Sequence, residues 1–587
     1  MLELSFFNAL ILFTLLIFLL VIFLCRVPIG PRLPKAFPCH GYKLLILLLI
    51  FYIVLTVYCI FFELRTVIWF YLYTILIVAI FSASMTKERK LSFLLMSLLI
   101  VGLSGIVLSL VINGPTPIFS DESRFAGFGY RITQDGRWTP YLFPENPYYQ
   151  FFHMLPALYA LVTIIVGLDV FSSTHSLLIL MIASTVYLNA FVAFRNFFGK
   201  IELGILGTLL IVITPQILIL GLMPQVLVIA LYFTVLSVLS IPIRGNNSRK
   251  NIILLVLICT VGVIAHGMFP LLLLTTLLAL LFAENGHAKW ESIRSVSRSV
   301  VHFAIPLTLI YWTYTLIMDQ IVNIGKSLSR SVIDLFMRNI QPFEYSRPVW
   351  YAKAPAELAL SWAFLPALTA AFIVTEMASK LWGLSNVKRT FQKKHVNPLL
   401  SMGVIGLLLL GISFLSKLAS PDPITRLFYP FYILLICPST MIINKITSCK
   451  RTINVLLLTV LFATVSFYAI HDPAISPDVS KIMLTSNKRS WAIGQTLAQY
   501  ASQDVSYHID QRVSMGFGAR ILKDAPQIFM QYSKVYLYDF VILGSDEIGS
   551  LWANYKLNES LLQKIKTNNC SRVFTDGMYT GYLTKRE

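Results

Sequence analysis

The segment "FFHMLPALYALVTIIVGL", residues 151–168, decides how the chain is threaded through a membrane. It is apolar enough to cross a hydrocarbon core of about 30 Å. A crossing here would place the basic turn "RNFFGK", residues 195–200, on the wrong side of the membrane. We therefore predict that 151–168 lies in the outer interface or re-enters it, with His153 and the pair Tyr148–Tyr149 at the polar boundary.

The chain around this segment has the composition of a helical membrane protein. Of its 587 residues, 57% are hydrophobic and only 13% are charged, about half the charged share of a soluble protein. Apolar runs of spanning length recur as far as residue 470, and ten-residue alternating strands are absent. We predict an α-helical polytopic membrane protein with about 13–15 crossings. The predicted spans are 6–24, 44–62, 66–84, 92–113, 177–195, 201–215, 224–242, 251–268, 270–283, 300–318, 357–378, 399–416, 425–443 and 453–470.

Basic residues gather in short stretches between these spans, which the positive-inside rule places in the cytoplasm. Counting crossings from them places the acidic loop 114–150, the loop 319–356, the tail from His471 and both termini outside. The same distribution accounts for the net charge of +19, so we exclude nucleic acid as a partner. The basic stretches are 25–35, 86–90, 243–250, 289–298, 380–395 and 444–451.

Four parts follow from this topology. An N-terminal set of transmembrane helices is followed by an outer loop with an acidic motif and interfacial helices. A transmembrane core that includes loop 319–356 comes next, and a small extracytoplasmic α/β domain ends the chain. The seven cysteines form neither a disulfide framework nor a CxxC pattern. The four predicted parts are residues 1–113, 114–175, 176–470 and 471–587.

The tail contains three predictable elements. The stretch "RSWAIGQTLAQYAS" (489–502) has the pattern of an amphipathic helix, and "KVYLYDFVILG" (534–544) has that of a strand. The stretch "RVFTDGMYTGYLTK" (572–585) predicts a hairpin that turns at Asp576–Gly577.

The predicted spans are nearly free of charged residues at their centres. An ion-coupled transporter carries ionisable groups in mid-membrane, whereas Glu202, Asp319, Glu357 and Glu376 all fall near span ends. The polar chemistry lies at the outer surface, which favours an enzyme or a receptor over a pump.

Asp121 and Glu122 open the acidic loop, directly after the helix-ending residues of "NGPTPIFS". The residues that follow predict a short helix whose apolar face, with Phe125, Phe128 and Ile132, lies on the membrane. Carboxylates at a helix N-terminus are stabilised by the dipole and by local N–H groups. The two acids can therefore be a helix cap. They can equally accept a proton from an attacking hydroxyl or hold a divalent cation.

The order of features after the acids resembles the GT-C superfamily of polytopic glycosyltransferases. The series runs from Asp121–Glu122 through "YRITQDGRW", "LPALYALVTIIVGL" and "FRNFFGK" to "GILGTLLIVITP". It is similar to the protein O-mannosyltransferase and lipid A aminoarabinose transferase branch and to archaeal relatives. The resemblance covers residues 115–245 well and the other helices in general plan. The chain departs from the pattern in two places: about four spans precede the acidic loop, which normally follows the first helix, and "GLMPQ" (221–225) stands where a basic–acidic pair is usual.

The resemblance implies a hexosyltransferase of the cell membrane that uses a polyprenyl- or dolichyl-phosphate sugar. Its acceptor would be a glycan, a lipid or a protein at the outer face. Asp121 matches the general base, and Glu122 matches the second acid of the pair; either acid could support a cation such as Mg²⁺ or Mn²⁺.

Cations at the outer interface would bind the donor phosphate. Arg426 is the first candidate for that role, and an interface anchor is its alternative; Arg124 and Lys353 are further candidates. His266, and His153 at the loop end, are candidates for contact with the substrate, although His266 also fits a plain capping role.

Three other functions stay open from the sequence. A lipid-linked glycan polymerase or ligase would use a late, arginine-rich outer loop, and 319–356 carries Arg330, Arg338, Arg347 and Lys353. A lipid flippase or transporter needs no charge in mid-membrane. A non-catalytic receptor would bind its partners through the tail.

Overall fold

The computed structural model describes helices and strands distributed over most of the chain. Predicted span 6–24, most of 453–470, and nearly all of loop 319–356 lie outside the described residues. The described ranges are 40–62, 67–84, 91–113, 120–137, 153–167, 174–214, 224–241, 247–281, 288–315, 356–381, 397–419, 432–448, 507–509, 540–544, 571–575 and 579–583, with a few isolated positions.

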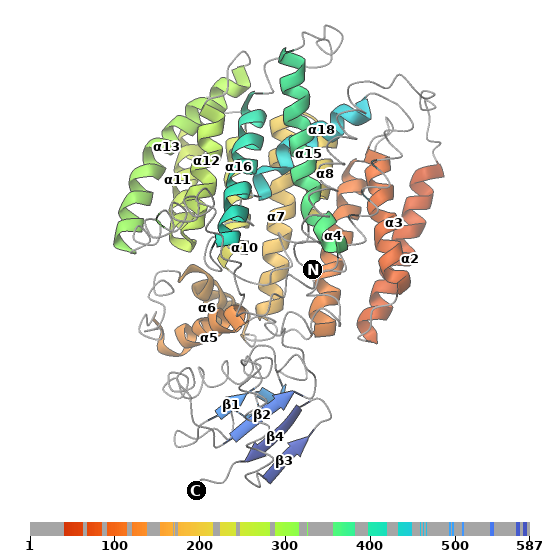
Figure 1. The fold of residues 1–587 in the computed structure, drawn as a ribbon, viewed down its shortest axis with the longest axis vertical. Helices are drawn as coiled ribbons and strands as arrows, with labels where there is room; N and C mark the ends of the chain where they lie inside the picture. Colours follow the sequence, from red (N-terminus) through yellow and green to blue (C-terminus); the bar gives the residue numbers. More distant parts are fainter. Residues whose placement is uncertain are drawn as a thin grey trace.

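Long helices coincide with most of the predicted spans and stand side by side as a bundle (Figure 1). The bundle helices are α2 (His40–Phe61), α3 (Val67–Ser84), α4 (Leu91–Asn113), α7 (His175–Phe198), α8 (Ile201–Val212), α10 (Pro224–Leu239), α11 (Asn247–Ala265), α12 (Met268–Leu281), α13 (Ala288–Tyr314), α15 (Ala356–Leu381), α16 (Asn397–Ala419) and α18 (Ile436–Ser448).

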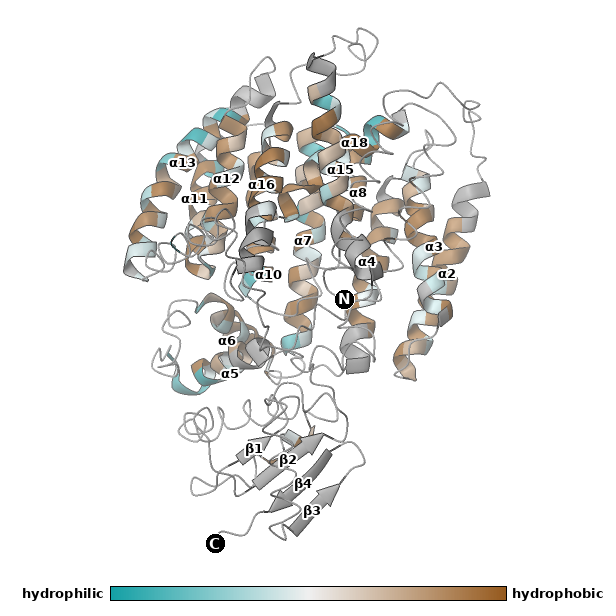
Figure 2. Ribbon diagram, in the orientation of Figure 1, coloured by the Kyte–Doolittle hydropathy of each residue, from teal (hydrophilic) through white to brown (hydrophobic). Residues whose placement is uncertain are grey.

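The bundle is apolar outside as well as inside. Figure 2 shows hydrophobic residues along most of these helices, and large side chains such as Leu47, Val54 and Ile310 are exposed. A soluble fold rarely exposes apolar rows of this extent. By length and composition, α7 is long and apolar enough to cross a membrane, and the other described apolar stretches are shorter.

A tight hairpin joins α7 to α8. Gly199 ends α7 with φ 66°, a left-handed conformation that glycine adopts without steric cost. Gly204 and Gly207 of α8 then face Phe191 and Phe194, and a Cβ on Gly207 would lie 2.3 Å from the Phe194 ring. The predicted turn "FRNFFGK" is therefore a close helix–helix connection.

Helix ends predicted to share one side of the membrane lie together at one end of the bundle. Asn196 Nδ2, near the end of α7, donates to Ser240 Oγ, directly after α10, at 3.2 Å. Lys445 of α18 lies 3.7 Å from Glu376 of α15. At the opposite end, the Tyr311 hydroxyl of α13 donates to the Ile264 carbonyl of α11. The assignment of these ends to the two sides of the membrane stays a prediction.

The C-terminal strands form a four-stranded sheet in the order β1-β2-β4-β3, drawn beyond one end of the bundle in Figure 1. Strand β1 pairs with β2 in parallel, and the other pairs are antiparallel, with an irregularity in β3 between Arg572 and Phe574. The predicted strand is confirmed over 540–544, and the antiparallel pairing of the predicted hairpin is confirmed by β3 and β4. The turn at Asp576–Gly577 lies outside the described residues, and the division into a separate domain stays a prediction. The strands are β1 (Tyr507–Ile509), β2 (Phe540–Gly544), β3 (Ser571–Thr575) and β4 (Tyr579–Leu583).

The Glu376–Lys445 pair gives a test of the bundle. Its side chains are only 7% and 11% exposed, so removing one charge leaves the other buried without its ion-pair partner, a cost of about 3 kcal/mol. We expect Glu376→Leu to unfold at a clearly lower temperature than the wild type in detergent. The double variant Glu376→Leu/Lys445→Met should recover much of the loss, and equal stability of the single and double variants would contradict the pairing.

Candidate active site

Helix α5 (Ser120–Asp135) begins where the sequence predicts, with Asp121 and Glu122 in its first turn. The helix ends at Gly136, which has φ 66° and donates its N–H to the Ile132 carbonyl at 2.9 Å. The side chains of Asp121, Glu122 and Arg124 lie outside the described residues. The backbone alone places both acids at the positive end of the helix dipole, where a carboxylate is stabilised.

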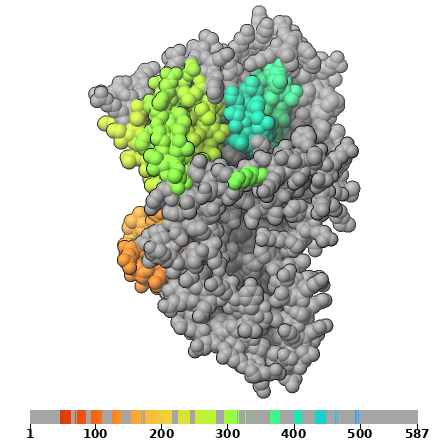
Figure 3. All heavy atoms as spheres, turned by 60° about the vertical axis from the view of Figure 1, so that its left-hand side comes forward, coloured from red at the N-terminus to blue at the C-terminus, as the bar shows by residue number. Residues whose placement is uncertain are grey.

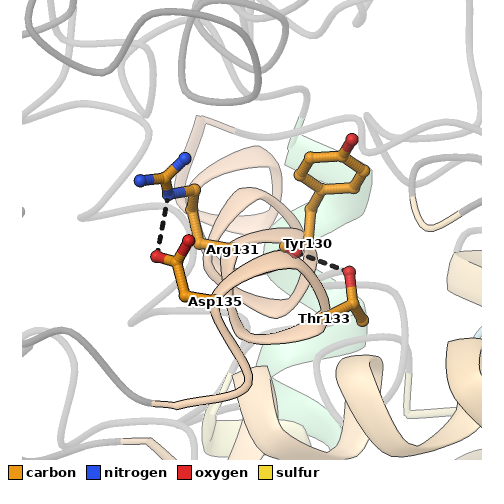
Figure 4. A network of polar contacts seen from close by, with 4 residues as sticks. All are labelled: Tyr130, Arg131, Thr133 and Asp135. Carbon is orange, nitrogen blue, oxygen red and sulfur yellow. Dashed lines mark hydrogen bonds and ion pairs between the residues drawn. The ribbon is translucent and has the colours of Figure 1, made fainter.

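The charged residues at the other end of α5 pair locally (Figure 4). Arg131 Nε lies 3.3 Å from Asp135 Oδ2, one turn along the helix, and the Thr133 hydroxyl donates to the Tyr130 carbonyl at 2.6 Å. Such a partly exposed pair contributes little to stability. The Asp135 carboxylate is therefore engaged in an ion pair on its own helix.

The apolar face of α5 packs on protein, which corrects the prediction that it lies on the membrane. Phe125 and Phe128 are each 2% exposed, and α5 packs closely against α6 (Met154–Val166). Gly129 sets the separation, since a Cβ there would lie 2.3 Å from Tyr159 Cβ and 3.1 Å from the Pro156 carbonyl oxygen.

Helix α6 is too short to cross a membrane. It has 13 residues, roughly 20 Å of rise against about 30 Å of hydrocarbon. It follows His153, whose side chain makes no capping bond, and ends at Gly167 with φ 70°. Ile164 and Ile165 are 67% and 71% exposed, so one face is open and apolar while Tyr159 is buried. This geometry fits the interfacial placement predicted for 151–168.

Two polar contacts join α6 to the start of α7. The Tyr159 hydroxyl lies 2.6 Å from His175 Nδ1 with both groups buried, and the two rings are nearly parallel. Thr163 Oγ1 donates to Thr174 Oγ1 at 3.2 Å. Sequence reasoning missed these residues. The available signal was a histidine opening an apolar helix in "STHSLLIL", which suits a buried core position equally well.

His266 lies between α11 and α12 and caps the second of these helices. Its Nδ1 accepts the Met268 N–H at 3.2 Å, and its carbonyl accepts the Phe269 N–H at 3.0 Å. The capping alternative for His266 is therefore confirmed, and a contact with the donor stays a prediction.

The structure brings together only some of the predicted site residues. Helix α5, which opens with Asp121 and Glu122, packs on α6, which begins after His153. Figure 3 shows the described surface of α5 and α6 in orange, beside that of α11 and α13 in lime and green. Arg426 and Lys353 lie outside the described residues. Within the described part of the chain, no group of three His, Cys, Asp or Glu residues could hold a metal ion.

Comparisons with known proteins give structural neighbours only, because no protein-family model and no curated protein matches the sequence. An Archaeoglobus fulgidus oligosaccharyltransferase tethered to an acceptor peptide with the NVT sequon is similar at 11% identity and a TM-score of 0.45, over 84% of this chain and 74% of that one. The complex of the same oligosaccharyltransferase with Zn and sulfate is similar at 12% identity and a TM-score of 0.42, over 83% of this chain and 73% of that one. ArnT from Cupriavidus metallidurans bound to undecaprenyl phosphate is similar at 11% identity and a TM-score of 0.43, over 84% of this chain and 98% of that one.

The similarity extends over most of the chain, but the identities and TM-scores are low.

The close approach at Gly129 gives a second test. Gly129→Ala would force α5 away from Tyr159, and this steric cost should exceed the gain in helix propensity of about 1 kcal/mol. We expect a lower unfolding temperature. Gly411→Ala on α16 is the control, because no atom lies within 4 Å of a Cβ there and the variant should be unchanged or slightly stabilised. An equal response of the two variants would rule out the α5–α6 contact.

Proposed function

We propose that this protein is a membrane glycosyltransferase, which transfers a sugar from a polyprenyl-phosphate-linked donor to an acceptor hydroxyl or amide at the outer face. One observation carries the proposal. A helix that starts at Ser120 holds Asp121 and Glu122 in its first turn, and this helix packs on a short helix too short to cross the membrane. This arrangement supports a site with two carboxylates at the end of the apolar bundle, where the head group of a lipid-borne substrate would lie.

The transfer is a single inverting displacement. Asp121 accepts the proton of the acceptor group, whose oxygen or nitrogen attacks the anomeric carbon as its bond to the phosphate oxygen breaks. The electron pair leaves with polyprenyl phosphate, a stable anion that needs little general-acid help. A carboxylate held ionised at a helix N-terminus is ready to take the proton.

The donor phosphate requires cationic partners. Arg426, Arg124 and Lys353 are our candidates for that role, because guanidinium and ammonium groups match phosphate oxygens. Asp121 and Glu122 are hard oxygen ligands that suit Mg²⁺ or Mn²⁺, which commonly binds one or two carboxylates together with substrate phosphates. A bound cation would supply charge neutralisation on the phosphate side of the reaction.

The distribution of buried charge argues against an ion-coupled transporter. Among the described residues, Glu376 is the charged side chain that is buried, and it pairs with Lys445 near the ends of α15 and α18. Neither residue lies at the centre of a predicted span. Proton or ion coupling would need ionisable groups there.

Substitution of the proposed base tests the proposal. We expect Asp121→Asn to lower transfer from polyprenyl-phosphate mannose or glucose by about 10²–10⁴-fold, the usual contribution of a general base, with Glu122→Gln less severe. Asp135→Asn is the matched control, because Asp135 is at the far end of the same helix beside Arg131. Transfer that survives in Asp121→Asn protein of normal stability would refute the assignment.

Chelation tests the cation. If Asp121 and Glu122 hold Mg²⁺ or Mn²⁺, EDTA should lower transfer, and added metal should restore it. Glu122→Gln should then require a higher metal concentration for half-maximal activity. If EDTA does not change the rate of transfer, Asp121 and Glu122 do not hold a weakly bound cation. The proposed role of Asp121 as the general base would be unaffected by that result.

A further inference from the structure

Two buried polar atoms without hydrogen-bond partners lie at the end of the bundle that α6 covers. One is Nε2 of His175 in the first turn of α7, and the other is Oε1 of Gln225 in the first turn of α10. His175 is 0% exposed. Buried polar atoms in folded proteins are nearly always paired, and exceptions call for a partner such as a water, an ion or a ligand.

The register of α7 and α10 gives the relative heights of the two residues along the bundle. The helices run parallel, because Asn189 donates to Thr234 at 2.9 Å and Asn196 donates to Ser240 at 3.2 Å. His175 lies 14 residues before Asn189, and Gln225 lies nine residues before Thr234. The heights of the two residues therefore differ by roughly 7.5 Å along the helix axes, about one and a half helical turns. Helix α6 contacts both α7 and α10 at this end.

The bonding capacity of the two atoms restricts the chemistry of a ligand. Nδ1 of His175 is engaged by the Tyr159 hydroxyl, so in either tautomer the remaining nitrogen requires its own partner. Gln225 Oε1 can only accept a hydrogen bond. An ionised phosphate has no proton to donate to it, and a prenyl chain bonds to neither atom. A sugar hydroxyl both donates and accepts, and it suits both positions.

We propose that His175 and Gln225 bind hydroxyl groups of the sugar carried by the lipid-linked donor. This assignment rests on the proposed glycosyltransferase function and names the part of the donor that the two residues recognise. Tyr159 is a positioning residue in this arrangement, because its hydroxyl fixes the orientation of the imidazole. The same Tyr159 packs against Gly129 of α5, so the sugar-binding end and the helix that carries Asp121 share one contact.

Binding measurements with three probes test the assignment independently of turnover. Full-length protein in lipid nanodiscs would be titrated with polyprenyl-phosphate mannose, polyprenyl-phosphate glucose and polyprenyl phosphate without a sugar. We expect Gln225→Met to weaken binding of at least one sugar-bearing lipid by about tenfold, as for loss of one buried hydrogen bond. Its affinity for the bare lipid phosphate should change by less than about twofold.

The paired variant Tyr159→Phe/His175→Phe removes both members of the buried contact while keeping aromatic volume, and it should show the same selective loss. Thr74→Val and Ser297→Ala are matched controls, because each removes a buried hydroxyl that also lacks a partner, on α3 and α13. The controls should bind all three probes like the wild type. If Gln225→Met does not fold, Gln225→Asn retracts the oxygen by about one bond length and should give the same selectivity.

Three results would overturn the assignment: equal weakening of all three probes, unchanged binding in both site variants, or a wild type that does not prefer either sugar-bearing lipid. Failure of the catalytic proposal has a different signature. Asp121→Asn would then retain transfer, while the selective binding losses at Gln225 and His175 would still be seen.

Discussion

The contact between Gly129 and Tyr159 is the constraint on which the candidate site depends. Any larger residue at Gly129 would meet Tyr159 Cβ, so the absence of a side chain fixes how closely α5 lies on α6. Tyr159 in turn reaches the start of α7 through His175. Helices α5 and α6 are therefore tied to the bundle by a small residue and a buried polar pair. The helix that carries Asp121 is therefore part of the packed structure.

Polar and apolar chemistry are separated along the bundle for a physical reason. Helices satisfy their own backbone groups, so they can expose rows of Leu, Ile and Val without an unpaired donor. Side-chain polar groups inside the bundle then need partners from neighbouring helices, as Asn189 finds in Thr234. Where the chain leaves the bundle, it no longer has to span the membrane, so short helices that end at a glycine can form, as α6 does at Gly167. A site that binds a lipid with a charged head group needs an apolar surface for the chain and polar groups for the head group next to each other.

The sequence predicts the helices well because long apolar runs have few alternatives. The turns at Gly167 and Gly199 and the hairpin of β3 and β4 follow from equally local rules. The orientation of Phe125 and Phe128 could not be predicted, because periodicity shows that a face is apolar but not whether lipid or α6 covers it. The pairs Tyr159–His175 and Glu376–Lys445 depend on contacts between helices. No spacing in the sequence marks them.

The cap and catalytic interpretations of Asp121 and Glu122 are compatible. A helix N-terminus stabilises negative charge, which favours the ionised carboxylate that a proton acceptor must be. Stronger stabilisation makes that carboxylate a weaker base, so the arrangement suits a reaction in which little basicity is required. Displacement of a phosphate is such a reaction, because the leaving group departs as a stable anion. In the proposed mechanism, Glu122 either supports a cation or orients the acceptor, and both acids belong to the first turn of α5.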